Sequence, residues 1–211
     1  MSIYLPPHFE QTSPEAVVAL IAEFPLATMI TTGEHGIVAN HIPMQFAPAD
    51  GENGILRGHV ARKNAIWHST RTDFEVLGIF QAPDAYITPN WYASKQLNHE
   101  VVPTWNYAVV HMYGQIRFHD DEKWLRGVIG KLTKAMESDQ PVPWSMAQAP
   151  RDYLAARLEE IVGVEIQVTR LIAKWKVSQN RSVADRQGVA AGLRQSDEER
   201  NEWMVSAVEK S

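Results

Sequence analysis

Four short stretches of the chain combine hydrogen-bond donors with flat aromatic side chains, which are the residue types that hold a planar, charged ligand. They are Arg57 to Asn64, Thr88 to Lys95, Thr104 to Tyr107 and Lys174 to Arg181. In the third stretch, Trp105 and Tyr107 flank Asn106, whose amide can both donate and accept hydrogen bonds. This set predicts contact with a planar ligand that has polar edges. An alternative stays open, in which Trp105 and Tyr107 pack as the cap of a β core.

A second prediction concerns the cations that follow the predicted strand Ile55 to Ala61. Arg62 and Lys63 stand between this strand and a predicted short helix from Ala65 to Ser69. Cationic side chains next to free backbone N–H groups form a natural phosphate pocket. The alternative is a solvated basic loop, which is the commoner fate of an Arg-Lys pair.

The whole-chain totals limit the class of protein. The 211 residues are 45% apolar and 21% charged, which is typical of a globular protein, and this length is within reach of a single all-β domain. A formal net charge of -5 argues against a nucleic-acid footprint over the whole surface. The chain has no cysteine, which excludes disulfides and thiolate chemistry, and no signal peptide or membrane span is recognisable, so we expect a cytoplasmic protein without membrane contact.

The elements that must position these residues are mostly strands. We expect an extended arm over Met1 to Gln11, and then a helix that Ser13 caps and Pro14 opens. Further helices are predicted from Asp120 to about Met136, from Asp152 to Ile161 and after Ser196. Strands are predicted at 26–32 and 37–46, as a hairpin, and at 55–61, 74–81, 109–118 and 163–169, with Trp105 to Tyr107 in the loop before the fifth strand.

This order of elements favours a mainly β fold, a β-barrel with peripheral helices of the α+β class, over a parallel α/β sheet. We expect one domain over residues 1–211, with a C-terminal helical extension over about 183–211. No Gly-rich phosphate loop follows the first strand, so a Rossmann or P-loop nucleotide site is not expected.

The chain also resembles a known family. The strings YLPPHF, GHVARKN, VPTWNY (followed by Val110, His111 and Gly114) and KVSQNRSVADRQGV occur in order over nearly its whole length. Together they resemble the PaiB-type family of FMN-binding negative transcriptional regulators, which is similar in turn to the flavin-binding split-barrel proteins.

The resemblance implies a split β-barrel that forms a homodimer and binds FMN at the subunit interface. It implies that Arg62 and Lys176 hold the phosphate, that Asn64, Gln179 and Arg181 bond the polar edges, and that Trp105 and Tyr107 form walls for the ring. The full set of implied cofactor-binding residues is His59, Val60, Ala61, Arg62, Asn64, Trp105, Asn106, Tyr107, Lys176, Gln179, Asn180 and Arg181. The chain departs from the expected pattern at Ala65, where we would expect proline.

The regulatory function is the weaker implication, because the sequence contains no basic helix-turn-helix. Gly188 and Gly192 argue against a recognition helix over Arg181 to Arg194, so we expect a solvated loop there. DNA binding therefore rests on the resemblance, and transcription would be controlled indirectly or through a surface that only the dimer assembles.

Two other functions stay open. The same site would serve a flavin-dependent oxidoreductase, and some split-barrel relatives handle haem, for which His41, His59, His99 and His111 are the available ligands. These histidines lack paired ligand spacing, so no metal site is expected. Ser94 with Lys95 is interpreted as ordinary loop chemistry, since no base is positioned beside the serine.

Overall fold

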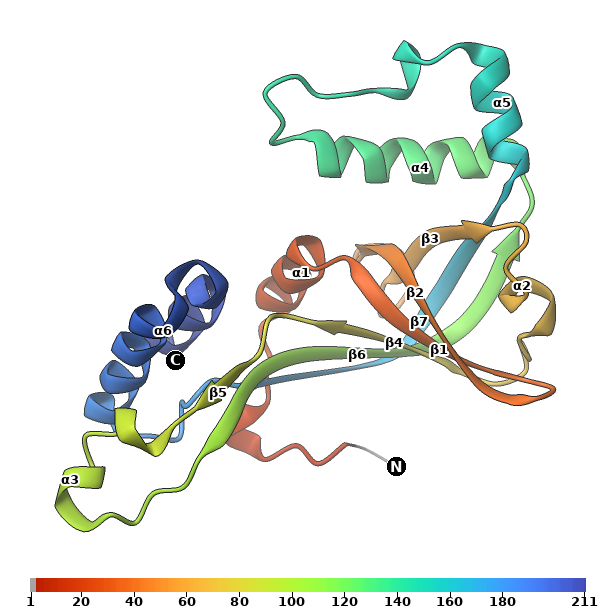
Figure 1. Cartoon of the computed structure of the whole chain (residues 1–211). Helices are drawn as coiled ribbons and strands as arrows, with labels where there is room; N and C mark the ends of the chain where they lie inside the picture. Colours follow the sequence, from red (N-terminus) through yellow and green to blue (C-terminus); the bar gives the residue numbers. More distant parts are fainter. Residues whose placement is uncertain (1–2) are drawn as a thin grey trace. The chain divides into compact units, whose positions relative to one another are not determined.

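The computed structural model describes residues 3–211, apart from the side chains of residues 198 and 200. Seven strands form one sheet in the order β4-β1-β2-β3-β7-β6-β5, and a further pairing of β4 with β6 closes a ring (Figure 1). The strands are β1 (Leu26–Gly33), β2 (Gly36–Ala47), β3 (Ile55–Ala61), β4 (Val76–Gln81), β5 (Ala85–Ile87), β6 (Thr104–His119) and β7 (Ile161–Lys176). The predicted mainly β fold with peripheral helices is confirmed.

The described residues group into two compact units. Unit 1 comprises Met1–Leu20, Gln81–Val110 and Ile172–Ser211, and unit 2 comprises Ile21–Phe80 and His111–Leu171. The chain passes from one unit to the other within β6 and again within β7. The single domain over residues 1–211 stays a prediction.

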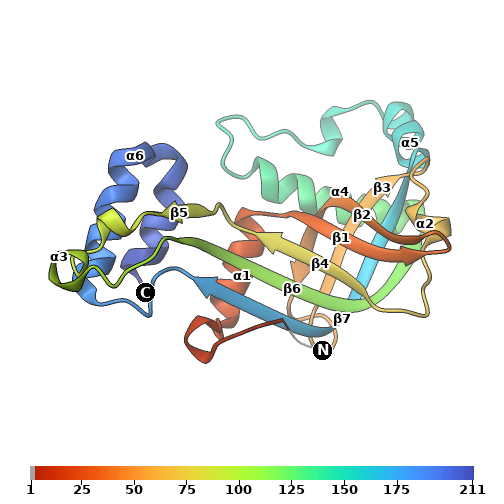
Figure 2. The same ribbon diagram turned by 60° about the horizontal axis from the view of Figure 1, so that its bottom comes forward.

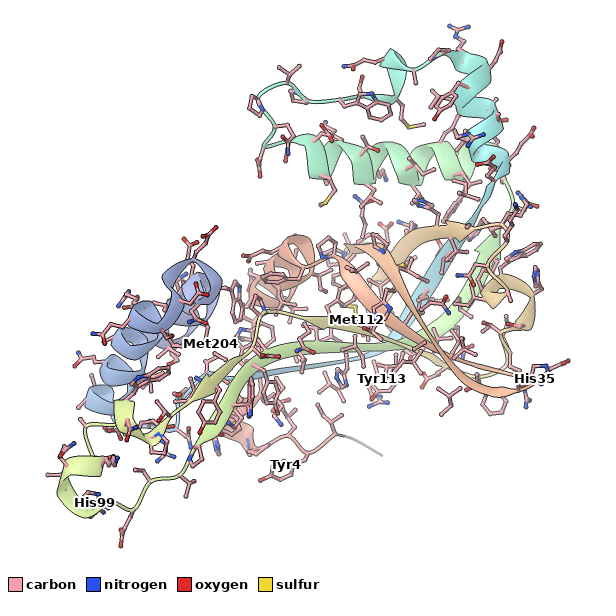
Figure 3. The ribbon with its side chains drawn as sticks, viewed as in Figure 1. Tyr4, His35, His99, Met112, Tyr113 and Met204 are labelled. Atoms are coloured by element: carbon pink, nitrogen blue, oxygen red, sulfur yellow. The ribbon has the colours of Figure 1, made fainter. Side chains whose placement is uncertain are left out.

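In unit 2, the predicted hairpin of β1 and β2 is confirmed. The two strands pair from Leu26 with Pro43 to Gly33 with Gly36, and Figure 3 shows His35 at the turn between them. Gly36 has φ 107°, a left-handed conformation that glycine adopts without steric cost. Ala27 and Met29 are fully buried, because side chains alternate between the two faces of a strand and these two face the core.

Helices α2 (Ile66–Ser69), α4 (Glu122–Glu137) and α5 (Arg151–Glu159), and the 3-10 turn η3 (Met146–Gln148), also belong to unit 2. Figure 1 shows α5 folded back beside α4, with which it is in contact. The helix predicted from Asp120 is confirmed: α4 begins after Asp121, whose side chain accepts a hydrogen bond of 2.7 Å from the Trp124 N–H. The Trp124 ring packs directly against Gly163 of β7, where a Cβ atom would clash with it.

Unit 1 holds strand β5, the 3-10 turns η1 (Pro7–Phe9) and η2 (Pro89–Trp91), helix α3 (Lys95–Asn98), and helix α6 (Val183–Glu209). Helix α1 (Pro14–Glu23) begins in unit 1 after Ser13, whose hydroxyl accepts from the Ala16 N–H as predicted. A buried cluster joins α6 to β5 and to the segment around Tyr92, and Figure 3 labels Met204 within it. Its buried members are Ala85, Ile87, Tyr92, Val177, Val189, Ala190, Leu193, Met204, Val205 and Val208.

The solvated loop predicted for Arg181 to Arg194 is wrong, because Ser182 caps α6 and the residues from Val183 onward form the first part of this helix. The helix is interrupted at Asp197 (φ -173°, ψ 95°) and then continues to Glu209. Gly188 and Gly192, the residues that argued against a helix, face Trp91: a Cβ atom at either position would clash with its carbonyl oxygen or its indole ring. The two glycines therefore serve helix packing and do not break the helix.

A second correction concerns Trp105 to Tyr107, which belong to β6 and not to a preceding loop. Ala85, Tyr86 and Ile87 of β5 pair with Asn106, Trp105 and Thr104 and extend the strand to that point. No helix among residues 3–211 is long and apolar enough to cross a membrane.

Candidate functional site

The twelve residues predicted to bind the cofactor fall into two groups. His59, Val60, Ala61, Arg62 and Asn64 lie in unit 2, and the other seven lie in unit 1.

Arg62, just after β3, uses all three nitrogen atoms of its guanidinium group in hydrogen bonds. Its Nη1 donates 2.8 Å to one Asp120 oxygen, Nη2 donates to the other, and further bonds reach the carbonyl oxygens of Glu159 and Ile161. This bidentate pair lowers the pKa of Asp120, chiefly through the hydrogen bonds from Arg62. A phosphate at Arg62 would have to replace a carboxylate that already fills the fork.

The rest of this motif is also occupied with local structure. Asn64 donates 2.8 Å to Asn40 Oδ1 and accepts 3.0 Å from the Ile66 N–H, so it satisfies the start of α2. Val60 is buried in the core, whereas Ala61 is exposed. The cofactor-binding roles of these residues stay predictions. In the structure, Asn64 and Val60 have structural roles, in hydrogen bonding and in core packing.

His59 lies opposite Gly163 in the register of β3 with β7. Its Nδ1 atom is buried without a hydrogen-bond partner among the described residues, and burial lowers its pKa. On the same sheet, Arg57 bonds both Asp50 and Glu165, and His119 stacks on Trp124 with ring centroids 4.2 Å apart. The Arg57 and Arg62 charges of this motif are thus neutralised by carboxylates.

The unit 1 group offers an exposed aromatic pair. Trp105 of β6 is 55% exposed and Tyr86 of β5 is 49% exposed, which is unusual for such large rings. These two residues are register partners, so their side chains lie on the same face of the sheet, and their ring centroids are 5.7 Å apart at 69° (Figure 2 shows β5 beside β6). The pair can contact a planar ligand without any rearrangement of the core.

Lys176, at the end of β7, lies beside this pair. Its Nζ donates to Thr104 Oγ1 and to the carbonyl oxygen of Trp105. Burial, and then the positive charges of Lys174 and Arg181, lower the pKa of Lys176. Among the described residues, no carboxylate oxygen lies within 4.0 Å of Lys176 Nζ, so Lys176 forms no ion pair with them.

Several polar members of this group build the turn that follows β7. Asn106 is 1% exposed and donates 2.9 Å to Ser178 Oγ, and Ser178 adopts φ 69°. The Gln179 amide accepts 2.8 Å from the Val177 N–H and donates to the Trp175 carbonyl oxygen. These two amides are therefore committed to the protein, whereas Asn180 is exposed.

Arg181 lies over the ring of the buried Tyr92, with its Cζ 4.6 Å from the ring centroid. The nearby Asp185 carboxylate accepts from the Ser94 N–H at 2.8 Å and from Ser94 Oγ at 3.0 Å. Burial acts to raise the pKa of Asp185, but these bonds outweigh it and the pKa is lowered. Ser94, interpreted from the sequence as ordinary loop chemistry, thus anchors the loop to α6.

Sequence reasoning missed two residues of unit 1. Tyr86 lies outside the strands predicted from the sequence, and only the pairing of β5 with β6 places it beside Trp105. Lys174 is only 8% exposed, which is unusual for a lysine. The sequence gives little sign that Lys174 is buried, because the alternating residues Lys174, Trp175 and Lys176 are equally typical of a strand whose lysines are solvated.

The unit 1 group fits a flavin nucleotide in its chemistry. Exposed aromatic faces suit the ring, and cations without a carboxylate partner suit a phosphate. The side chains that the structure describes include no cluster of three His, Asp or Glu residues that could hold a metal ion.

Comparison with known proteins identifies a family that matches most of the chain. Residues 3–170 match the family described as "Putative FMN-binding domain". The chain is similar to "Protease synthase and sporulation protein PAI 2" of Bacillus subtilis, with 32% identity over 208 residues, 98% of this chain and 97% of that protein.

Two solved structures share the fold. The flavocytochrome Anf3 from Azotobacter vinelandii aligns with a TM-score of 0.60 and 11% identity, over 80% of this chain and 69% of that one. The FAD and heme binding protein from Mycobacterium smegmatis aligns with a TM-score of 0.55 and 15% identity, over 79% and 72%. At these identities the likeness shows the split-barrel fold alone.

Proposed function

Because the chain belongs to the PaiB-type family of FMN-binding split-barrel proteins, we propose that it binds FMN and acts as a negative transcriptional regulator whose flavin state biases its partners. The observation that carries the proposal is the unit 1 face, where the exposed rings of Trp105 and Tyr86 stand beside Lys176. A cytoplasmic location is part of the proposal, and cell fractionation tests it.

In this proposal the chain's own residues bind and orient the cofactor. Trp105 and Tyr107 contact the ring, and Lys176 supplies positive charge for the phosphate. Bound FMN would supply electron-transfer chemistry, so its redox state is a signal that a regulator can use. The buried turn of Asn106 and Ser178 keeps β6 and the terminal motif in fixed register, because the two side chains bond to each other.

The role proposed for Arg62 can be separated from that of Lys176. Arg62 already bonds Asp120 through both oxygens, whereas Lys176 has no carboxylate partner among the described residues. We therefore expect Lys176→Met to weaken FMN binding more than Arg62→Ala does. An Arg62→Ala protein that binds FMN as tightly as wild type would remove Arg62 from the phosphate site.

The first experiment is a titration of the purified protein with FMN, followed by flavin fluorescence and by light scattering. Saturable quenching at one flavin per subunit of a dimer is the expected result, and it supports both the cofactor and the proposed homodimer. Trp105→Ala should weaken binding. Trp144→Ala, which removes another partly exposed tryptophan from unit 2, is the matched control and should bind normally.

Two further measurements test the alternatives. Turnover of a nicotinamide cofactor by the FMN-loaded protein, stimulated by an added substrate, would support a flavin-dependent oxidoreductase. A Soret band after addition of haem, weakened by replacing one histidine, would support a haem protein. Retention of genomic DNA fragments in a manner that depends on flavin would support the regulator.

A further inference from the structure

Lys174 is a buried cation with little to balance it. The residue is 8% exposed, and the hydrogen bond that its Nζ makes among the described residues is 3.0 Å long, to the carbonyl oxygen of Tyr4 on the N-terminal arm. The rings of Tyr4 and Tyr107 lie over the ammonium, with centroids 5.5 Å and 5.3 Å from Nζ. No carboxylate among the described residues forms an ion pair with it.

Such a group is expensive for a folded protein. An ammonium has three donors, and burying a charge without an opposite charge costs several kcal/mol unless other groups compensate. One carbonyl oxygen and two ring faces compensate only in part.

Two more cations share this environment. Lys176 follows Lys174 by two residues on β7, so both side chains lie on the same face of the strand. The positive charges of Lys174 and Arg181 both act on Lys176. Asp185, a carboxylate in electrostatic range of Arg181, is already bonded to Ser94.

We propose that Lys174 and Lys176 together form the binding site for a phosphate dianion, and that the Tyr4 carbonyl oxygen occupies at Lys174 the place of one phosphate oxygen. This inference rests on the proposed function in one respect: the phosphate is assigned to the ester end of FMN. Lys174 lies outside the set of residues that the family resemblance implies. A dianion would neutralise the repulsion within the cluster and satisfy donors that the protein leaves unused.

Position supports the same ligand. Lys176 donates to the Trp105 carbonyl oxygen, and Lys174 lies over the ring of Tyr107, so both ammonium groups adjoin the aromatic residues of β6. A molecule with a flat ring and a phosphate would contact both features at once. Riboflavin, which has the ring without the phosphate, would contact only the first.

The test compares FMN, riboflavin and inorganic phosphate as ligands of the full chain. Lys174→Met and Lys176→Met remove each charge and keep much of the apolar stem, and Lys131→Met, an exposed lysine of α4, is the control. We expect each of the two site variants to weaken FMN binding about tenfold or more and to leave riboflavin binding unchanged, because a hydrogen bond to a charged group is lost. Equal loss for FMN and riboflavin, or no loss for either, would overturn the phosphate site.

Inorganic phosphate makes the result independent of flavin binding. At constant ionic strength, phosphate in place of chloride should raise the thermal midpoint of wild type and of Lys131→Met, but not of Lys174→Met. It should also raise the pKa of Lys176, followed by NMR of the lysine side chains, which a purely structural role of Lys174 would not predict.

The two proposals can fail separately. If wild type binds neither flavin and yet phosphate stabilises it through Lys174, the FMN assignment fails and the anion site stands. If FMN and riboflavin bind equally well and phosphate has no effect beyond chloride, the anion site fails and flavin binding stands. Lys176→Met carries the same comparison if Lys174→Met does not fold.

Discussion

Replacing Gly188 of α6 by alanine tests how the helix is held in unit 1. Helix propensity alone predicts a gain of about 1 kcal/mol, because alanine is the better helix former. The structure predicts a loss instead. The new Cβ atom would lie less than 3.0 Å from the Trp91 carbonyl oxygen and 3.2 Å from its carbonyl carbon, and neither atom belongs to a side chain that could rotate away.

The size of the loss follows from the geometry. Cβ atoms essentially never lie within 3.0 Å of a backbone oxygen, so α6 or η2 would have to move away from the other. Overpacking of this kind costs about 1–3 kcal/mol, and a backbone obstacle favours the upper end. After the gain in propensity, we expect Gly188→Ala to lower the free energy of unfolding by about 2 kcal/mol, or the thermal midpoint by about 4–8 °C.

Gly127→Ala is the matched control, because Gly127 lies within α4 and a Cβ atom there would have no atom within 4 Å. It should raise the free energy of unfolding by about 0.5–1 kcal/mol. Urea denaturation, followed by far-UV circular dichroism and tryptophan fluorescence, measures both variants. If Gly188→Ala is as stable as Gly127→Ala, the close approach of Trp91 to α6 is refuted.

Three further predictions concern single contacts. Ser94→Ala removes a 3.0 Å hydrogen bond to the Asp185 carboxylate, and urea denaturation should show a loss of about 1–3 kcal/mol; an unchanged midpoint would mean that the bond contributes nothing. Because burial lowers the pKa of His59, the unfolded chain takes up a proton near pH 6.5 that the folded chain does not. The free energy of unfolding should therefore fall as the pH drops below about 6.5. Urea midpoints measured across the pH range should show a smaller fall for His59→Gln than for wild type. Asp121→Ala should cost about 1 kcal/mol through the loss of the α4 cap, whereas Asp121→Asn should retain most of it; equal losses in urea denaturation would argue against capping.

The sequence predicted those elements whose signals are local. Ser13 and Pro14 predicted the start of α1, and Asp121 beside Asp120 marked the start of α4, because a helix cap involves only neighbouring residues. The turn Gly33 to Gly36 likewise predicted the first hairpin.

The failures depend on residues far apart in the chain. Gly188 and Gly192 were interpreted as helix breakers. Both positions need glycine because Trp91, about a hundred positions earlier, packs against them and leaves no room for a Cβ atom. The burial of Lys174 is set by Tyr4, 170 residues away. Arg62 looked free because Asp120 is 58 residues distant. Neither hydrophobic periodicity nor a short motif identifies partners that lie so far apart in the chain. The sequence therefore indicated the candidate residues but not the residues with which they interact.

The construction of unit 1 from three separate segments has a consequence for synthesis on the ribosome. The arm residue Tyr4 meets Lys174, and the Gln11 N–H bonds the Ala173 carbonyl oxygen, so neither contact can form until the chain has grown by more than 160 residues. At about 5–20 residues per second, this interval is roughly 10–30 s. Unit 2 is itself complete only at Leu171, so its last segment is synthesised just before Ala173 and Lys174. The arm therefore has no partner strand until β7 is synthesised, and unit 1 can be completed only after that.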